Sequence, residues 1–205
     1  GVRLQFMVST IDNQGHNNLA LLLQATNRLA EAEPLMKRAL AIDETSYGPE
    51  HPRVATPLNN LAQLLQATNR LAEAEPLMKR ALAIDETSYG PEHPRVATQL
   101  NNLAQLLQAT NRLTEAEPLM KRALAIDEAS DGPEHPDVAR DLNNLAQLLK
   151  ATNRLAEAEP LMRRTLYIFL VFTRSTGHAH PHLNAAFGNY LSLLQARADG
   201  DEKII

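Results

Sequence analysis

The sequence predicts an all-α protein built from about 4.5 helix–turn–helix repeats. The first reason is a period of 42 residues, at which a His-Pro pair and a further proline recur. The recurring residues are His51-Pro52, His93-Pro94 and His135-Pro136, and Pro34, Pro76, Pro118 and Pro160. The second reason is near-identity: residues 51–92 and 93–134 differ at four positions, and residues 17–50 match 59–92 except at Leu21. Such repeats are expected to stack into one continuous array.

The third reason is the helical spacing of apolar residues in each half of a repeat. In residues 54–67 they recur at spacings of three and four, which buries one face of a helix. First helices are therefore predicted near residues 10–25, 52–67, 94–109, 136–151 and 181–196. Pro57 has no counterpart in the other first helices, and it is expected to bend or delay its own helix.

A short polar turn and a second helix complete each repeat. Thr68-Asn69-Arg70 predicts the turn, because asparagine tolerates left-handed backbone. Second helices are predicted near residues 30–46, 72–88, 114–130 and 156–174. Pro76 is tolerable about one turn into its helix, where most backbone donors lack partners anyway. Gly90 is available to cap the helix end, and Pro91 blocks its continuation.

The repeat boundaries give the expected domain organisation. Residues 1–16 are interpreted as an N-terminal cap or a truncated repeat. Residues 17–180 form the array, in units 17–50, 51–92, 93–134 and 135–179. Residues 181–196 are expected to form a C-terminal capping helix, and residues 197–205 a tail.

The composition argues against several classes of protein. A net charge of −4 provides no basic field for nucleic acid or for an anionic membrane surface. The chain has no cysteine, which excludes disulfides and thiolate chemistry. The longest strongly apolar stretch, residues 166–172, is far shorter than the ~20 residues of a membrane-spanning helix. No signal peptide is recognisable, so a cytoplasmic location is expected.

At this point the repeat resembles a known family. The order Leu58, Leu61-Ala62, Leu65, Ala74, Met78, Ala81 is similar to the tetratricopeptide repeat (TPR). The 42-residue length and the Leu-Asn-Asn-Leu-Ala run resemble the kinesin-light-chain type of that repeat. Two departures are that Glu86 replaces the proline usual at the end of the second helix, and that the first helix lacks large aromatic residues. The resemblance implies an α-α superhelix whose first helices line a concave groove.

The same resemblance implies that the polar face of the first helices binds an extended peptide or another protein. An asparagine amide both donates and accepts, so it can bridge a peptide backbone. The candidate residues are Asn17, Thr56, Asn59, Gln63, Gln66, Thr98, Asn101, Gln105, Gln108, Arg140, Asn143, Gln147 and Lys150. The alternative is that these side chains are only a solvated helix face, or that they bond neighbouring helices. Arg140 and Lys150 are the only basic residues of the set, so an acidic group would bind there.

No pattern supports catalysis or a cofactor. A glycine-rich phosphate loop is absent from the sequence, and identical units spread each residue type along the array rather than gathering several in one pocket. His178, His180 and His182 have a composition typical of metal sites. However, His180-Pro181 is the His-Pro pair of each repeat displaced by three residues, so no metal is predicted.

The C-terminal region differs from the other repeats. The segment Tyr167–Phe172 is apolar on nearly every side. We expect the last helix, with Leu183, Phe187, Tyr190, Leu191 and Leu194, to bury it. The alternative is a homodimer or partner interface through Tyr167–Phe172. The sequence therefore predicts a non-enzymatic protein-binding scaffold, with a structural, self-associating module as the second possibility.

Overall fold

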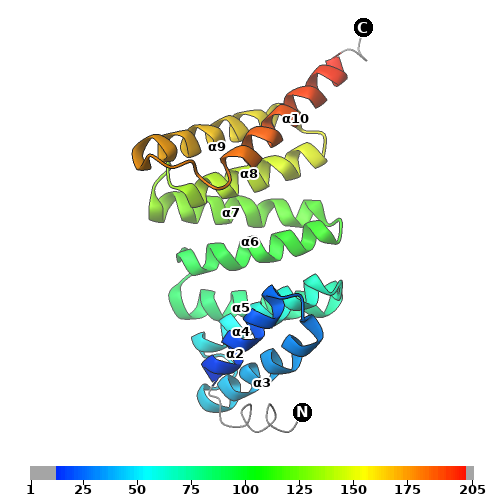
Figure 1. Ribbon diagram of the computed structural model, residues 1–205, viewed down its shortest axis with the longest axis vertical. Coiled ribbons are helices and arrows are strands. Elements are labelled where there is room, and N and C mark those ends of the chain that lie inside the picture. Colours follow the sequence, from blue (N-terminus) through cyan, green and yellow to red (C-terminus); the bar gives the residue numbers. More distant parts are fainter. Residues whose placement is uncertain (1–12, 202–205) are drawn as a thin grey trace. The chain divides into compact units, whose positions relative to one another are not determined.

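The described part of the chain, residues 13–201 of the computed structural model, consists of α-helices joined by short turns and contains no strand (Figure 1). The helices are α2 (Asn13–Ala25), α3 (Leu29–Tyr47), α4 (Pro52–Ala67), α5 (Leu71–Tyr89), α6 (Pro94–Ala109), α7 (Leu113–Asp131), α8 (Pro136–Ala151), α9 (Leu155–Thr176) and α10 (Leu183–Asp201). The all-α prediction is confirmed. Most predicted helix ends agree with the structure to within one residue, since the turn residues mark them.

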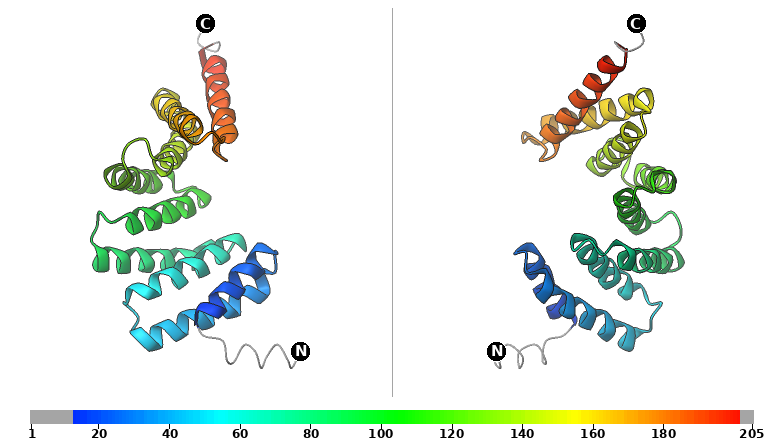
Figure 2. Two further views of the ribbon diagram at one scale, coloured as in Figure 1. Left: turned by 60° about the vertical axis from the view of Figure 1, so that its left-hand side comes forward. Right: turned by 90° about the vertical axis from the view of Figure 1, so that its right-hand side faces the viewer.

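The chain divides into two compact units, residues 1–106 and residues 107–205, and each is described by itself. In the first unit, α2 and α4 pair with α3 and α5 as helical hairpins, and α3 packs against α4. In the second unit, α7 packs against α8, and α8 pairs with α9. Helix α10 lies mainly against α9, as the red and yellow helices in Figure 2 show. The expected N-terminal cap, residues 1–16, falls largely outside the described residues.

The turn inside each hairpin adopts the backbone predicted for it. Asn27, Asn69, Asn111 and Asn153 all have φ 59°, in the left-handed region. The N–H of Arg70 donates to the carbonyl of Leu65 at 2.8 Å, which satisfies one of the last carbonyls of α4. Thr68 adds a bond from its hydroxyl to the carbonyl of Leu64 at 3.1 Å. The Thr-Asn-Arg run therefore ends the first helix through a left-handed asparagine and hydrogen bonds to the last carbonyls of the helix.

The His-Pro pairs begin the first helices, a role that the sequence analysis did not assign to them. The ring Nδ1 of His51 accepts the backbone N–H of Arg53 at 3.2 Å, so the imidazole is the N-cap. His93, His135 and His180 accept in the same way at 3.1, 3.2 and 3.3 Å. The proline after His51 or His135 is the first helical residue, where its missing N–H costs nothing.

The two unusual prolines leave the helices continuous. Pro76 lies near the start of α5, as expected, and is exposed. Helix α4 begins at Pro52, in register with the start of α6 at Pro94, so the expectation that Pro57 delays its helix is wrong. Pro57 removes one backbone hydrogen bond from α4. Its ring is buried, so it contributes apolar contacts to the packed face of the helix.

Each unit has its own apolar core where a first helix meets the second helices. In unit 1, Val54 and Leu58 of α4 pack with Ala81 and Ile84 of α5, and Leu40 of α3 covers the cluster. The cluster in unit 2 consists of Val138, Ala139, Leu142, Ile168, Phe169 and Ala186. These contacts are between neighbouring helices, as a repeat array requires.

Ion pairs on the second helices and turns link neighbouring repeats in unit 1. Arg70 contacts Glu33 of the preceding repeat at 2.8 Å, and Arg80 contacts Glu44 at 2.6 Å. Hydrogen bonds from Lys37 and Arg70 hold the pKa of Glu33 below its ordinary value. These pairs are partly exposed, so each contributes little to stability.

The last helix buries only one of its two apolar faces. Ala186 and Leu193 are buried, whereas Phe187, Leu191 and Leu194 are 53%, 51% and 38% exposed. The helix also continues to Asp201, into the segment expected to be a tail. The segment Tyr167–Phe172 is divided in the same way: Ile168 and Phe169 are buried, and Tyr167 and Leu170 are more than half exposed. No helix in the described residues is long and apolar enough to cross a membrane.

Candidate functional site: the polar face of the first helices

The predicted binding residues lie on the first helices, and within each unit we call the polar side of these helices the first-helix face. Asn17 lies on α2, Thr56, Asn59, Gln63 and Gln66 on α4, Thr98, Asn101, Gln105 and Gln108 on α6, and Arg140, Asn143, Gln147 and Lys150 on α8. Most are exposed or half-buried. Asn101 is the exception, with 5% of its surface exposed.

Asparagines of neighbouring first helices are hydrogen-bonded to one another. The Oδ1 of Asn59 accepts from Asn102 at 3.0 Å, and the Oδ1 of Asn17 accepts from Asn60 at 3.1 Å. The second asparagines of two runs, Asn60 and Asn102, thus each bond the preceding first helix. Asn17 and Asn59 therefore each have a structural bond at the amide oxygen, and the Nδ2 of each is the group best placed to donate to a ligand.

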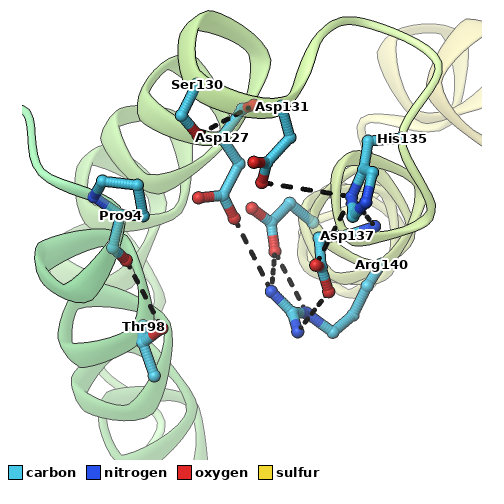
Figure 3. Close-up of polar contacts among 9 residues, drawn as sticks. Pro94, Thr98, Asp127, Ser130, Asp131, His135, Asp137 and Arg140 are labelled. Atoms are coloured by element: carbon cyan, nitrogen blue, oxygen red, sulfur yellow. Dashed lines mark hydrogen bonds and ion pairs between the residues drawn. The ribbon is translucent and has the colours of Figure 1, made fainter.

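A polar cavity of about 260 Å³ opens on this face in unit 1. It is lined by Thr56, Asn59, Asp85, Arg95, Thr98 and Gln99. Three of these residues are predicted site residues on two different helices, so the structure places them around one cavity. The hydroxyl of Thr98 turns back to the carbonyl of Pro94 in its own helix at 3.4 Å (Figure 3).

The floor of this cavity is a buried carboxylate that the sequence analysis missed. Asp85 of α5 is fully buried, and its Oδ2 accepts from the amide of Gln99 at 2.9 Å. The guanidinium of Arg95 lies 3.5 Å from the other oxygen of Asp85. The periodicity could have indicated this burial, because Asp85 continues the apolar stripe of Ala74, Met78 and Ala81 at helical spacing.

The equivalent buried positions in unit 2, where α7 faces α8, carry a different charge. Asp127 and Asp141 replace the Asp85–Gln99 pair, and both are buried. Burial and a hydrogen bond with Asp141 raise the pKa of Asp127 to about 7. Arg140 extends across this corner, with its guanidinium 3.6 Å from Asp127, 3.4 Å from Asp141 and 2.9 Å from Asp137 (Figure 3). Arg140 is therefore already paired with three carboxylates, and it is a weaker candidate for binding an acidic ligand than expected.

Lys150 is the better candidate for such a ligand. Its ammonium donates to the hydroxyl of Ser192 at 2.6 Å, and no carboxylate in the described residues forms an ion pair with it. It lines a second cavity, of about 280 Å³, together with Gln147, Ala151, Met162 and Asn189. The amide of Asn189 donates to the Oδ1 of Asn143 at 3.0 Å, which repeats the asparagine pairing of unit 1.

Two histidine-containing clusters are structural in this geometry. Asp131, His135 and Asp137 place three possible ligand atoms within 4.8 Å of one another, but the His135 ring caps α8 and Arg140 holds Asp137. The ring of His180, in the turn before α10, accepts the N–H of His182 at 3.3 Å and stacks on Phe169, with ring centroids 4.2 Å apart. Burial and the nearby His182 lower the pKa of His180, which favours the neutral ring that can accept this bond. We assign no metal to either cluster.

Tandem helical hairpins with a polar first-helix face define the class of protein. The family model described as "Tetratricopeptide repeat" matches residues 12–87, 70–129 and 95–169. The chain therefore belongs to the tetratricopeptide repeat family, and the resemblance inferred from the sequence is confirmed.

Solved structures of similar fold are kinesin-light-chain-like. Two are crystal structures of a kinesin light chain of Podosopora anserina with nearly identical TPR-like repeats, one of them a form with a single substitution, both 25% identical to this chain. Each match covers 92% of this chain and 88% of the other, with TM-scores of 0.78 and 0.76. BtubC (BKLC) from P. vanneervenii is 26% identical, with a TM-score of 0.78, over 91% of this chain and 73% of that one. No curated protein matches the chain.

Proposed function

We propose that this chain is a non-enzymatic scaffold that binds a protein or an extended peptide on the first-helix face. The observation that carries the proposal is the position of the two cavities. One adjoins Thr56, Asn59 and Thr98 in unit 1, and the other adjoins Gln147 and Lys150 in unit 2. Membership of a family whose repeats commonly bind proteins supports the same conclusion.

The asparagine pairing sets how the face would bind. The Oδ1 of Asn59 and of Asn143 already accepts from a neighbouring helix, so in the proposed complex each amide uses its Nδ2 to donate to a ligand carbonyl. Backbone carbonyls of an extended peptide fit this requirement whatever the side chains are. Lys150 adds a preference for an acidic group near the second cavity. A cytoplasmic location is part of the proposal, because the chain has no cysteine.

Substitution of Asn59, Asn101 and Asn143 by alanine in one chain tests the proposal. We expect the affinity for a partner isolated with the wild-type chain to fall at least about tenfold, because each lost hydrogen bond contributes roughly 1 kcal/mol. Titration calorimetry with the purified partner measures this, and circular dichroism verifies the fold.

The matched control is Asn102→Ala, which breaks the bond to Asn59 but leaves the Asn59 donor in place. It should retain most of the affinity. Equal affinity of the triple variant and the wild type, with the fold intact, would refute binding on this face.

A second function, self-association, is favoured by the exposure of Tyr167 and Leu170, at 54% and 55%. If this surface forms a homodimer, light scattering will detect a dimer that Leu170→Glu dissociates. A monomer at high concentration would exclude it.

A further inference from the structure

The cavity of unit 1 contains two buried acceptor atoms with no hydrogen bond. Gln99 is 6% exposed and Asp85 is fully buried. The Nε2 of Gln99 donates to the Oδ2 of Asp85 at 2.9 Å, which identifies the other amide atom, Oε1, as an acceptor. Within the described part of the chain, neither Oε1 of Gln99 nor Oδ1 of Asp85 accepts a hydrogen bond. Because a buried polar atom without a hydrogen bond is costly, the two atoms favour a ligand group that donates.

The same cavity also offers donors. The Nε of Arg95 lies 3.5 Å from the Oδ1 of Asp85, at ion-pair distance, but it donates no hydrogen bond among the described residues. Another nitrogen of this guanidinium contacts the hydroxyl of Thr56 at 3.4 Å. Asn59 adds its Nδ2 group, since its Oδ1 already accepts from Asn102. A complementary ligand group therefore has two donors and one acceptor.

Charge decides between the ligand groups that could enter. Asp85 and Arg95 neutralise one another. A ligand carboxylate has no hydrogen to donate, and it would lie beside the carboxylate of Asp85. A ligand ammonium would either lie beside the guanidinium of Arg95 or have to displace it from Asp85. A neutral primary carboxamide avoids both costs, because it provides two N–H donors and one carbonyl acceptor.

The neighbouring repeats do not have this combination of residues. The positions of Asp85, Arg95 and Gln99 hold Asp43, Arg53 and Pro57 one repeat earlier, and Asp127, Asp137 and Asp141 one repeat later. The earlier set lacks the amide, and the later set lacks both the amide and the guanidinium. The cavity of unit 1 therefore has a chemistry of its own within an array of nearly identical repeats.

We propose that this cavity binds the primary carboxamide of an asparagine or glutamine side chain in the bound peptide. The inference rests on the proposed function, because a peptide held by Asn59 brings its side chains to the cavity. Asp85 and Gln99 accept the two N–H groups of the ligand, and Arg95 donates to its carbonyl oxygen. The side chain of Arg95 is 41% exposed, so it can shift to admit the ligand to the buried acceptors.

Three small probes of similar size test the ligand group: propionamide, propylammonium and propionate. The whole isotope-labelled chain is titrated with each, and NMR follows the side-chain amide signal of Gln99. We expect propionamide to shift this signal saturably and to bind at least about fivefold more tightly than either ion, the ratio expected from one hydrogen bond. The probes have no peptide backbone, so a negative result would leave the binding of backbone carbonyls by Asn59 and Asn143, tested by the triple variant, unaffected.

Arg95→Met tests the role of charge. It leaves Asp85 without its cation, so the preference should reverse in favour of propylammonium. Arg53→Met is the matched control, because Arg53 is the same residue one repeat earlier and contacts Tyr47 instead. It should bind propionamide as the wild type does, and circular dichroism verifies the fold of both variants. The proposal is overturned if propionamide leaves the Gln99 signal unchanged, if it binds the wild type no more tightly than either ion, or if Arg95→Met keeps the wild-type preference.

Discussion

One buried position in the second helix carries a different chemistry from repeat to repeat. Asp85 is opposite Gln99, Asp127 is opposite Asp141, and Phe169 is opposite Ala186. The Asp85 carboxylate accepts a hydrogen bond from the Gln99 amide, and two apolar residues need no partner. Two carboxylates in one buried corner repel unless one is protonated. These near-identical repeats should therefore differ in how their stability depends on pH.

We predict that the second unit loses stability as pH rises from about 4 to 7. The pKa of Asp127, about 7 in the fold, lies above its ordinary value of 3.8, so the folded state holds a proton that the unfolded state releases. Asp141→Gln copies the Asp85–Gln99 pair, and it should raise the free energy of unfolding at pH 8 by about 1–2 kcal/mol. Urea denaturation at several pH values measures this. Gln99→Asp should place two carboxylates together in unit 1 and lower its free energy of unfolding at pH 8. An unchanged dependence of stability on pH in both variants would contradict this explanation.

At the scale of the element, the helix ends come from local chemistry. A left-handed asparagine closes each hairpin, and a histidine ring with a following proline begins first helices. Both devices act over a few residues, so their positions follow from the sequence. The capping role of the imidazole was nevertheless missed, because histidine is not among the side chains commonly expected at an N-cap.

Asn69 provides the test at this scale. Its φ of 59° suits asparagine and glycine, whereas alanine in that conformation costs about 1–2 kcal/mol. Asn69→Ala should therefore lower the free energy of unfolding by roughly that amount, while Asn69→Gly should change it little. Chemical denaturation compares the two. Equal destabilisation would show that the amide side chain, and not the backbone conformation, is what the turn requires.

At the scale of the molecule, the repeats are nearly identical in sequence. They differ mainly at the buried positions of Asp85, Asp127 and Phe169 and at the last helix. The chain's similarity to TPR structures extends over 92% of its length although identity is 25%, because nearest-neighbour packing needs a pattern rather than particular residues. The departures from the repeat include Lys150 beside its cavity and the exposed apolar side chains of α10.

Deletion of residues 93–134 tests this modularity. It joins Glu92 to His135, a junction that already occurs as Glu134-His135. We expect a folded, helical chain that still melts in a single cooperative transition, at a lower temperature because one inter-repeat interface is lost. Calorimetry and circular dichroism measure this. A chain that fails to fold would show that the repeats are not equivalent.

The sequence by itself determined the period, the helix ends, the left-handed turns and the helices that carry the polar face, because all of these follow from local rules repeated every 42 residues. Only the tertiary structure decided which side chains of that face already have partners, since those partners lie on neighbouring helices. It joined Asn59 to Asn102, occupied Arg140 with three acids, and buried Asp85 beneath a cavity. It also left Phe187, Leu191 and Leu194 uncovered, because coverage depends on what packs beside a helix and not on the helix itself.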